Sequence, residues 1–185
     1  MAKDVRERMV AGATRLLATK GLQATSFSEV IELTSTPRGS IYHHFPGGKD
    51  ELVLAALQES CTIVLDGLGK AEGQDAAVVL DTLVTGWREL LERSEYSMGC
   101  AAVAVTVATD NDELLEAAGQ VFHDWEGRLT ELYTAGGLSV QDAADFAAHS
   151  LATIEGAVIL SRAERSIAVF DRAVRVLPRL LEALR

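Results

Sequence analysis

The sequence predicts an all-α protein, and three of its features support this fold class. Residues that favour helices, above all Ala, Leu and Glu, outnumber residues that favour strands. Apolar residues recur at three- and four-residue spacing along most of the 185 positions, as they do on one face of an α-helix. Capping residues and glycines divide this pattern into segments of helical length. A chain of this length can form a small head and a larger body, and we expect both to be helical.

The composition excludes several classes of protein. The chain is 48% hydrophobic and 24% charged, with three prolines, which is typical of a packed globular protein and not of a disordered one. No uncharged apolar run reaches the ~18 residues of a membrane span. The charged start at Lys3, Asp4 and Arg6 is unlike a signal peptide. Two cysteines, Cys61 and Cys100, suit a reducing compartment. We therefore expect a cytoplasmic protein that does not contact a membrane.

Charge is distributed unevenly along the chain, whose net charge is −10. The first fifty residues contain seven basic and five acidic side chains, whereas the remainder contains ten basic and twenty-two acidic ones. A mildly basic head on an acidic body is expected where only one end of a protein meets phosphate. An acidic surface that only keeps the protein soluble explains the same pattern.

The head begins with two predicted helices. The first extends from about residue 3 to residue 19, and Gly21 ends it. The second is capped by Thr25 or Ser26 and extends to Leu33, with Glu29 placed three residues after Ser26 as in a capping box. The inward-facing residues of the two helices are Met9, Ala13, Leu16 and Leu17 in the first and Phe27, Val30 and Ile31 in the second.

A turn at residues 34–36 leads to a third predicted helix of barely two turns, residues 37–44. We expect Thr36 to cap this helix and Pro37 to occupy its first position. Ile41 and Phe45 are four residues apart and point inward. The outward residues are Arg38, Ser40, Tyr42 and His43. Two short helices joined by a tight turn and braced by a preceding helix form a helix-turn-helix, whose second helix fits the major groove of DNA.

In the body, the apolar periodicity predicts further helices at about residues 49–68, 75–93, 100–108, 112–135 and 139–165. A last helix starts after Ser166 and kinks near Val174 because it contains Pro178. The valines of residues 100–108 are also compatible with a buried strand. We expect a DNA-binding domain at residues 1–47 and a helical domain for ligand binding and dimerisation at residues 48–185.

The head closely resembles the DNA-binding domain of the TetR family of bacterial repressors. The resemblance covers about residues 5–57 and is carried by the run Arg38-Gly39-Ser40-Ile41-Tyr42-His43-His44-Phe45, followed by Lys49-Asp50-Glu51-Leu52. Together with Met98-Gly99-Cys100, this run looks most like the LmrA/YxaF branch. The chain departs from the family at Ser35, where a turn glycine is usual, and at Ile31, where a small residue is usual. The resemblance implies a dimeric repressor that binds a pseudo-palindromic operator and is released by a small molecule.

The residues indicate how the head would contact DNA. Arg38 is the candidate for base readout, because Arg can bind both acceptors of guanine. Ser40 and His43 lie beside it, and Gly39 permits close approach. Lys49 starts a helix and is placed to hold a phosphate; the less favoured alternative is a solvated lysine. The resemblance makes Tyr42 a phosphate contact; its ring could also close the core. The full set of candidates is Thr25, Ser26, Thr36, Pro37, Arg38, Gly39, Ser40, Tyr42, His43 and Lys49.

The body is expected to hold a largely apolar effector against a ring-rich lining, without any cofactor or metal. The candidate ligand-binding residues are Cys61, Leu65, Trp87, Leu91, Phe122, His123, Trp125, Phe146 and His149. Of these and their neighbours, His123, His149 and Glu155 are the polar groups expected to orient a ligand, while the apolar ones could be plain core. We expect the long helix after Lys49 to transmit ligand binding to the head.

Two further expectations concern assembly and alternative functions. The last two helices predict a two-fold dimer through two apolar faces, although both could instead be buried within one chain. These faces consist of Ala147, Leu151, Ile154 and Val158, and of Val169, Ala173, Val176, Leu177 and Leu180. The alternatives are a redox sensor acting through Cys61 or Cys100, and a small helical enzyme, for which no metal-ligand spacing or phosphate loop is present in the sequence.

Overall fold

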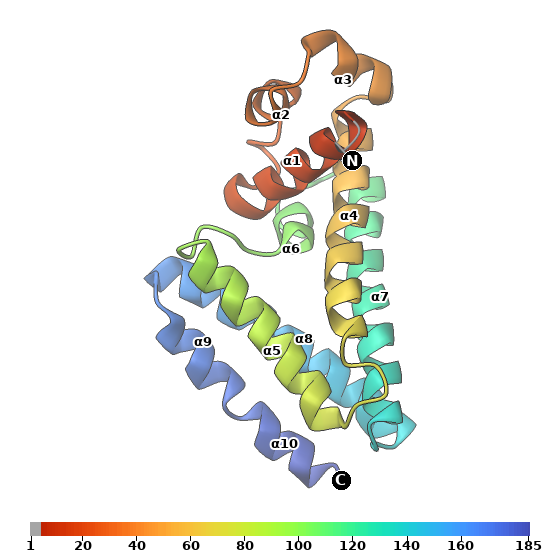
Figure 1. The fold of residues 1–185 in the computed structure, drawn as a ribbon, viewed down its shortest axis with the longest axis vertical. Helices are drawn as coiled ribbons and strands as arrows, with labels where there is room; N and C mark the ends of the chain where they lie inside the picture. The colour runs from red at the N-terminus through yellow and green to blue at the C-terminus, as the bar shows by residue number, and fades with distance from the viewer. Residues whose placement is uncertain (1–4) are drawn as a thin grey trace. The chain divides into compact units, whose positions relative to one another are not determined.

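The computed structural model describes residues 5–185, and in this part of the chain every regular element is a helix (Figure 1). The all-α prediction is confirmed, and the start predicted at residues 3 and 4 lies outside the described residues. The helices are α1 (Val5–Lys20), α2 (Phe27–Thr34), α3 (Arg38–His44), α4 (Lys49–Gly69), α5 (Ala76–Arg93), α6 (Ala101–Thr106), α7 (Asp112–Ala135), α8 (Val140–Glu164), α9 (Ile167–Val174) and α10 (Leu177–Ala183).

Side-chain caps set most of the helix starts where the sequence predicts them. The hydroxyl groups of Ser26, Ser139 and Ser166 accept backbone N–H groups at the starts of α2, α8 and α9, and the Asp75 carboxylate does so for α5. The Cys100 Sγ accepts from the Val103 N–H and starts α6. Residues 101–106 are thus helical, and the alternative of a buried strand is wrong.

The last predicted helix is divided more sharply than the sequence suggests. Instead of one kinked helix, α9 ends at Val174 and α10 begins at Leu177. Pro178 lies in the first turn of α10, where its missing N–H group leaves no intrahelical bond unmade. The break falls where the prediction placed the kink.

The described chain separates into two compact units. The N-terminal unit contains the residues up to Thr62 together with Cys100–Val121, and the C-terminal unit contains Ile63–Gly99 and Phe122–Arg185. Helices α4 and α7 each contribute residues to both units. The functional division that the sequence places after residue 47 stays a prediction.

In the N-terminal unit, α1 contacts α2, α3 and α6 (Figure 1). Its core is apolar, and Met9, Ile41, Phe45 and Leu52 have no exposed surface. Gly12 brings α1 close to α2, since a Cβ atom there would lie 2.5 Å from the Thr34 Cγ2 atom. This contact holds the end of α2 in place and with it the turn that leads to α3.

In the C-terminal unit, α8 packs against α5 and α9 around large aromatic side chains. Trp125, Tyr133, Phe146 and Phe170 are at most 1% exposed. The Ala76 N–H donates to the Gly136 carbonyl at 3.1 Å, and a Cβ atom at residue 136 would lie 2.5 Å from the Ala76 nitrogen. This backbone contact joins the end of α7 to the start of α5.

Helices α4 and α8 are long and apolar enough to cross a membrane by length and composition alone. Core helices of soluble proteins meet the same criteria, and both helices contribute buried side chains to the packed units, such as Leu52 and Ile154. Packing therefore explains part of their apolar character.

Candidate nucleic-acid interface and candidate ligand cleft

The turn between α2 and α3 depends on a left-handed residue that is not glycine. Ser35 has φ = 51°, and its N–H bonds back to carbonyls of the last turn of α2. A left-handed residue other than glycine costs about 1 kcal/mol. The position that usually holds glycine in the resembled family thus holds a left-handed serine here.

Thr36 stabilises this turn and does not cap α3. Its hydroxyl group lies 2.9 Å from that of Thr34, and Thr36 is 5% exposed. The residue that precedes α3 is Pro37, which supplies no side-chain cap. The prediction that Thr36 caps α3 is therefore wrong, because the buried hydroxyl is turned toward α2.

Two buried residues on the inner face of α3 fix this helix so that its outer face is exposed. Ile41 and Phe45 are completely buried, while Arg38, Gly39 and His43 are exposed and Ser40 is half-buried. Neither the Arg38 guanidinium nor the His43 ring has a hydrogen bond or an ion pair among residues 5–185. The N–H groups of these two side chains are therefore available to a partner, on a helix whose position is fixed by Ile41 and Phe45.

The Tyr42 ring packs on the surface of the head and does not close its core. Its ring packs edge-on against Phe27 with 5.4 Å between ring centroids, and the residue is still 67% exposed. The contact restrains the ring, and the exposed remainder leaves the hydroxyl group available at the edge of α3.

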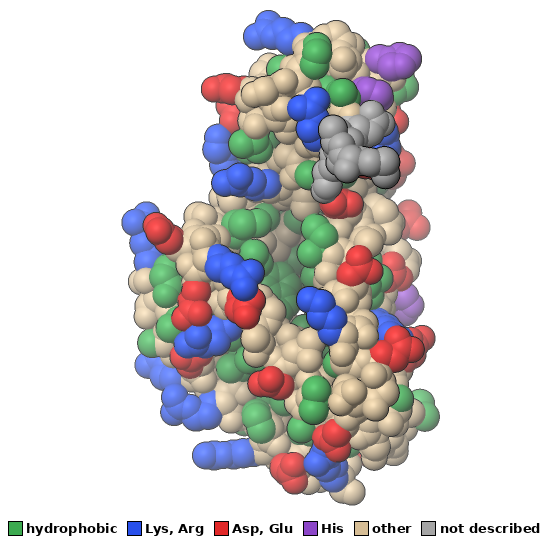
Figure 2. Space-filling model, viewed as in Figure 1, with side chains coloured by type: hydrophobic (Ala, Val, Ile, Leu, Met, Phe, Trp, Pro, Cys, Tyr) green, Lys and Arg blue, Asp and Glu red, His purple; other side chains and the backbone are tan. Residues whose placement is uncertain are grey.

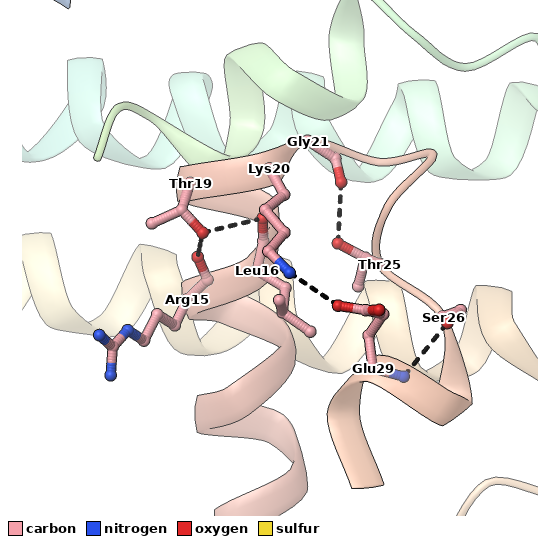
Figure 3. Close-up of polar contacts among 8 residues, drawn as sticks. All are labelled: Arg15, Leu16, Thr19, Lys20, Gly21, Thr25, Ser26 and Glu29. Carbon is pink, nitrogen blue, oxygen red and sulfur yellow. Dashed lines mark hydrogen bonds and ion pairs between the residues drawn. The ribbon is translucent and has the colours of Figure 1, made fainter. Parts of the chain in front are cut away.

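Ser26 makes half of the predicted capping box. Its hydroxyl accepts from the Glu29 N–H at 3.3 Å, but the Glu29 carboxylate binds the Lys20 Nζ at 2.7 Å (Figure 3). This contact raises the pKa of Lys20. The Thr25 hydroxyl donates to the Gly21 carbonyl at 2.9 Å and the side chain is fully buried (Figure 3). Thr25 therefore packs the head and does not lie at its surface.

Lys49 is tied to the loop that precedes α2. Its Nζ donates to the Leu22 carbonyl at 2.8 Å, and the residue is half-buried at the first position of α4. The neighbouring Asp50 accepts from the Asn111 side-chain amide at 2.9 Å. An ammonium group has three donors, so the bond to Leu22 leaves two of them for a phosphate.

A cleft of about 470 Å³ opens in the C-terminal unit between the end of α4 and the outer part of α5. Its floor contains Leu68, Leu83 and Trp87, which are at most 7% exposed. Figure 2 shows the molecular surface hollowed, with apolar side chains inside the hollow. Polar and charged residues border it, namely Lys70, Asp81, Thr82, Thr85 and Glu89.

Of the predicted ligand-binding residues, the structure places Trp87 in this cleft and the others elsewhere. Leu91, Trp125 and Phe146 are buried in the C-terminal core, and Cys61 is buried in the N-terminal unit. Leu65 and Phe122 are half-buried. His123 and His149 are exposed, so they cannot orient a ligand inside the described cleft.

The predicted dimer face on α8 is wrong, because it is already covered within the chain. Ala147, Leu151, Ile154 and Val158 are at most 7% exposed, since α5 and α9 pack against this helix. On the opposite, exposed side of α8, His149 lies among small and apolar residues. These are Ala148, Ala152, Gly156, Ile159, Leu160 and Ala163.

The alternative functions gain no specific support. Cys61 and Cys100 are buried and form no disulfide. Among residues 5–185, no group of three or more His, Cys, Asp or Glu side chains could hold a metal ion.

Comparisons with known proteins agree on one family. The family model for bacterial regulatory proteins of the tetR family matches residues 9–56, and the model described as "Transcriptional regulator LmrA/YxaF-like, C-terminal domain" matches residues 76–176. An HTH-type transcriptional regulator of Mycobacterium tuberculosis is 32% identical, over 96% of this chain and 94% of its own length. The HTH-type transcriptional regulator LmrA of Bacillus subtilis is 25% identical, over 85% and 86%.

Solved structures show the same fold. A TetR transcriptional regulator from Legionella pneumophila superposes with a TM-score of 0.86 at 18% identity, covering 97% of this chain and 98% of its own. The regulatory protein TetR from Rhodobacter sphaeroides has a TM-score of 0.84 at 22% identity, covering 94% and 97%.

Proposed function

The chain belongs to the TetR family of DNA-binding transcriptional regulators, in its LmrA/YxaF-like branch, and on this premise we propose that it is a ligand-responsive repressor. It binds a pseudo-palindromic operator as a homodimer, in the cytoplasm, and a small molecule releases it. It carries out no catalysis and needs no cofactor.

The outer face of α3 carries the DNA-binding proposal. Arg38 and His43 are exposed and make no hydrogen bond or ion pair among the described residues, on a helix whose other side is buried, which is how a recognition helix presents side chains to base edges. Ser26, Pro37, Ser40 and Tyr42 flank them, and Lys49 contributes a phosphate contact. Thr25 and Thr36 are buried and support this surface from within.

The exposed side of α8 supports the homodimer. Ile159 and Leu160 are 51% and 52% exposed there, and small residues one turn apart allow two helices to approach closely. Two-fold symmetry would pair this side with its copy and place two α3 helices on half-sites about 34 Å apart, or somewhat more.

Ile159→Asp tests the dimer. Sedimentation should give a dimer for the wild type and a monomer for Ile159→Asp, because a carboxylate would be buried against its symmetry mate. Val140→Asp is the matched control, since Val140 is 70% exposed on the same helix but off this side. A monomeric wild type at micromolar concentration contradicts the proposal.

Helix α4 is the proposed route from effector to DNA. It runs without interruption from Lys49 to Gly69, contributes its start to the N-terminal unit and lines the cleft with its end. A ligand that displaces the end of a continuous helix also moves its start, so a change of tilt would alter the spacing of the two α3 helices.

The operator is found by selecting duplexes from a random pool on the immobilised protein. We expect an inverted repeat. With the selected duplex, Arg38→Ala should weaken binding by about 1–3 kcal/mol and relax the preference at one base position. Lys49→Ala should weaken binding to all sequences alike. If Arg38→Ala has the same affinity for the selected duplex and the same base preference as the wild type, α3 is not the helix that recognises the base sequence.

A further inference from the structure

We propose that the cleft between α4 and α5 binds an apolar molecule that carries a basic nitrogen, and that Gly67 and Gly86 keep the cleft open for it. This inference rests on the proposed function in one respect only, namely that this molecule is the effector.

The two glycines are not explained by packing. Gly67 belongs to the last turn of α4 and Gly86 to the middle of α5, and both line the cleft. Glycine inside a helix destabilises it by about 0.5–1 kcal/mol relative to alanine. A Cβ atom at either position would meet no atom within 4 Å.

Other glycines of the chain show what a packing requirement looks like. A Cβ atom at Gly12 would lie 2.5 Å from a side chain, and one at Gly136 would lie 2.5 Å from backbone. At Gly67 and Gly86 the neighbouring space is empty in the structure. Helices α4 and α5 thus each place a glycine at the same cleft. The absence of two side chains leaves space in which a ligand can bind.

The residues at the floor of the cleft indicate that most of the bound molecule is apolar. Leu68, Leu83 and Trp87 supply an apolar surface, and the Trp87 ring is braced edge-on by Trp125 with 6.3 Å between centroids. A volume of about 470 Å³ lies within the usual range for small-molecule sites. An apolar molecule, aliphatic or aromatic, would cover the Ile63 side chain, which also lines the cleft and is 58% exposed.

The cleft border indicates the charge of the bound molecule. Asp81, Thr85 and Glu89 follow one another at four-residue spacing and form one line along α5. Asp81 has no ion pair or hydrogen bond among residues 5–185, while Glu89 binds Arg93 at 2.7 Å. Lys70 is the only cation among the lining residues and forms no ion pair with Asp81. Because Arg93 already pairs with Glu89, the carboxylate left to attract a cation on the α5 side of the cleft is that of Asp81.

A matched pair of dyes tests the charge. Rhodamine 6G is a planar aromatic cation, and fluorescein has the same xanthene core but is an anion. Dye anisotropy, measured without DNA, should show rhodamine 6G bound at least ten times more tightly than fluorescein. Asp81→Asn should weaken rhodamine 6G binding three- to tenfold, whereas Asp66→Asn, on α4 but outside the cleft lining, should not. Equal affinities for both dyes overturn the charge assignment.

A pair of glycine variants tests the site. Gly127 lies inside α7, is exposed and also has open space around a Cβ atom, but it does not line the cleft. Gly86→Leu and Gly127→Leu should therefore both raise the Tm, and only Gly86→Leu should weaken rhodamine 6G binding, by at least tenfold. In a Trp125→Phe background, Trp87 is the sole tryptophan and its fluorescence should change when the dye binds.

The outcomes separate this inference from the proposed function. If Gly86→Leu binds rhodamine 6G as tightly as Gly127→Leu does, the cleft is not the site, whatever the protein does to DNA. If the dye binds as expected but leaves the affinity for the selected duplex unchanged, the chemistry of the cleft stands and its role as effector site is overturned.

Discussion

The outer face of α3 and the cleft beside α5 form their surfaces in opposite ways. On α3, exposed side chains such as Arg38 project from a short helix that two buried residues, Ile41 and Phe45, hold in place. At the cleft, the important feature is missing side chains, because Gly67 and Gly86 leave space over an apolar floor. Removing atoms should thus damage the first site, and adding atoms should damage the second.

The largest expected effect on stability distinguishes the buried residues that hold α3 in place from the exposed residues that contact DNA. Phe45→Ala removes a fully buried ring and should destabilise the N-terminal unit by about 3–5 kcal/mol, so DNA binding is lost through unfolding. Arg38→Ala should leave the Tm unchanged while it weakens DNA binding. Urea unfolding followed by circular dichroism measures both variants. A Phe45→Ala protein as stable as the wild type would contradict the role of this buried residue.

A second variant sharpens the distinction between the two kinds of glycine. Gly136→Ala forces a Cβ atom against the Ala76 backbone and should destabilise the C-terminal unit by about 1–3 kcal/mol. Gly127→Ala, which meets open space, should stabilise it slightly. Thermal unfolding of the two variants side by side is sufficient, and a Tm that rises in both would show that the contact at residue 136 is not tight.

The core of the C-terminal unit also predicts a pH dependence. Burial raises the pKa of Tyr133 to about 12, above its value in the unfolded chain, so the folded protein retains a proton that the unfolded chain loses. Stability is complete below pH 10 and falls between pH 10 and 12, by about 1 kcal/mol per pH unit at most. Tyr133→Phe should reduce this fall in urea unfolding at pH 9 and 11. An identical fall in both proteins would exclude Tyr133 as its cause.

The smallest effect concerns the turn before α3. Ser35→Gly removes the strain of a left-handed serine and should raise the unfolding free energy by up to about 1 kcal/mol. DNA affinity should stay the same, because Ser35 belongs to the turn and not to the outer face of α3. A loss of DNA affinity without a loss of stability would assign Ser35 itself to the contact surface.

The sequence predicts the helices well because their starts are marked locally. Ser26, Asp75, Ser139 and Ser166 all cap helices in the structure. Thr36 misleads because a hydroxyl beside a proline can bond backward as well as forward, and only the packed turn shows that it meets Thr34.

The body is harder to interpret from sequence because α8 is apolar on more than one side. The helix carries apolar residues such as Ile154 and Ile159 on different sides, and only the packing of α5 and α9 shows that Ile154 is the covered one. The cleft is harder still. Gly86 is visible in the sequence, but the empty space beside it depends on where α4 ends, so Trp87 was the only lining residue among the predicted ligand contacts.

The most direct test of the whole account is a reciprocal titration with rhodamine 6G and the selected duplex. The dye should lower affinity for the duplex about 5–150-fold, and the duplex should lower affinity for the dye by the same factor, since coupling between two sites is reciprocal. Gly86→Leu should bind the duplex normally and not respond to the dye, which controls for any direct contact between dye and DNA. Duplex affinity that is the same with and without saturating dye in the wild type would contradict the account.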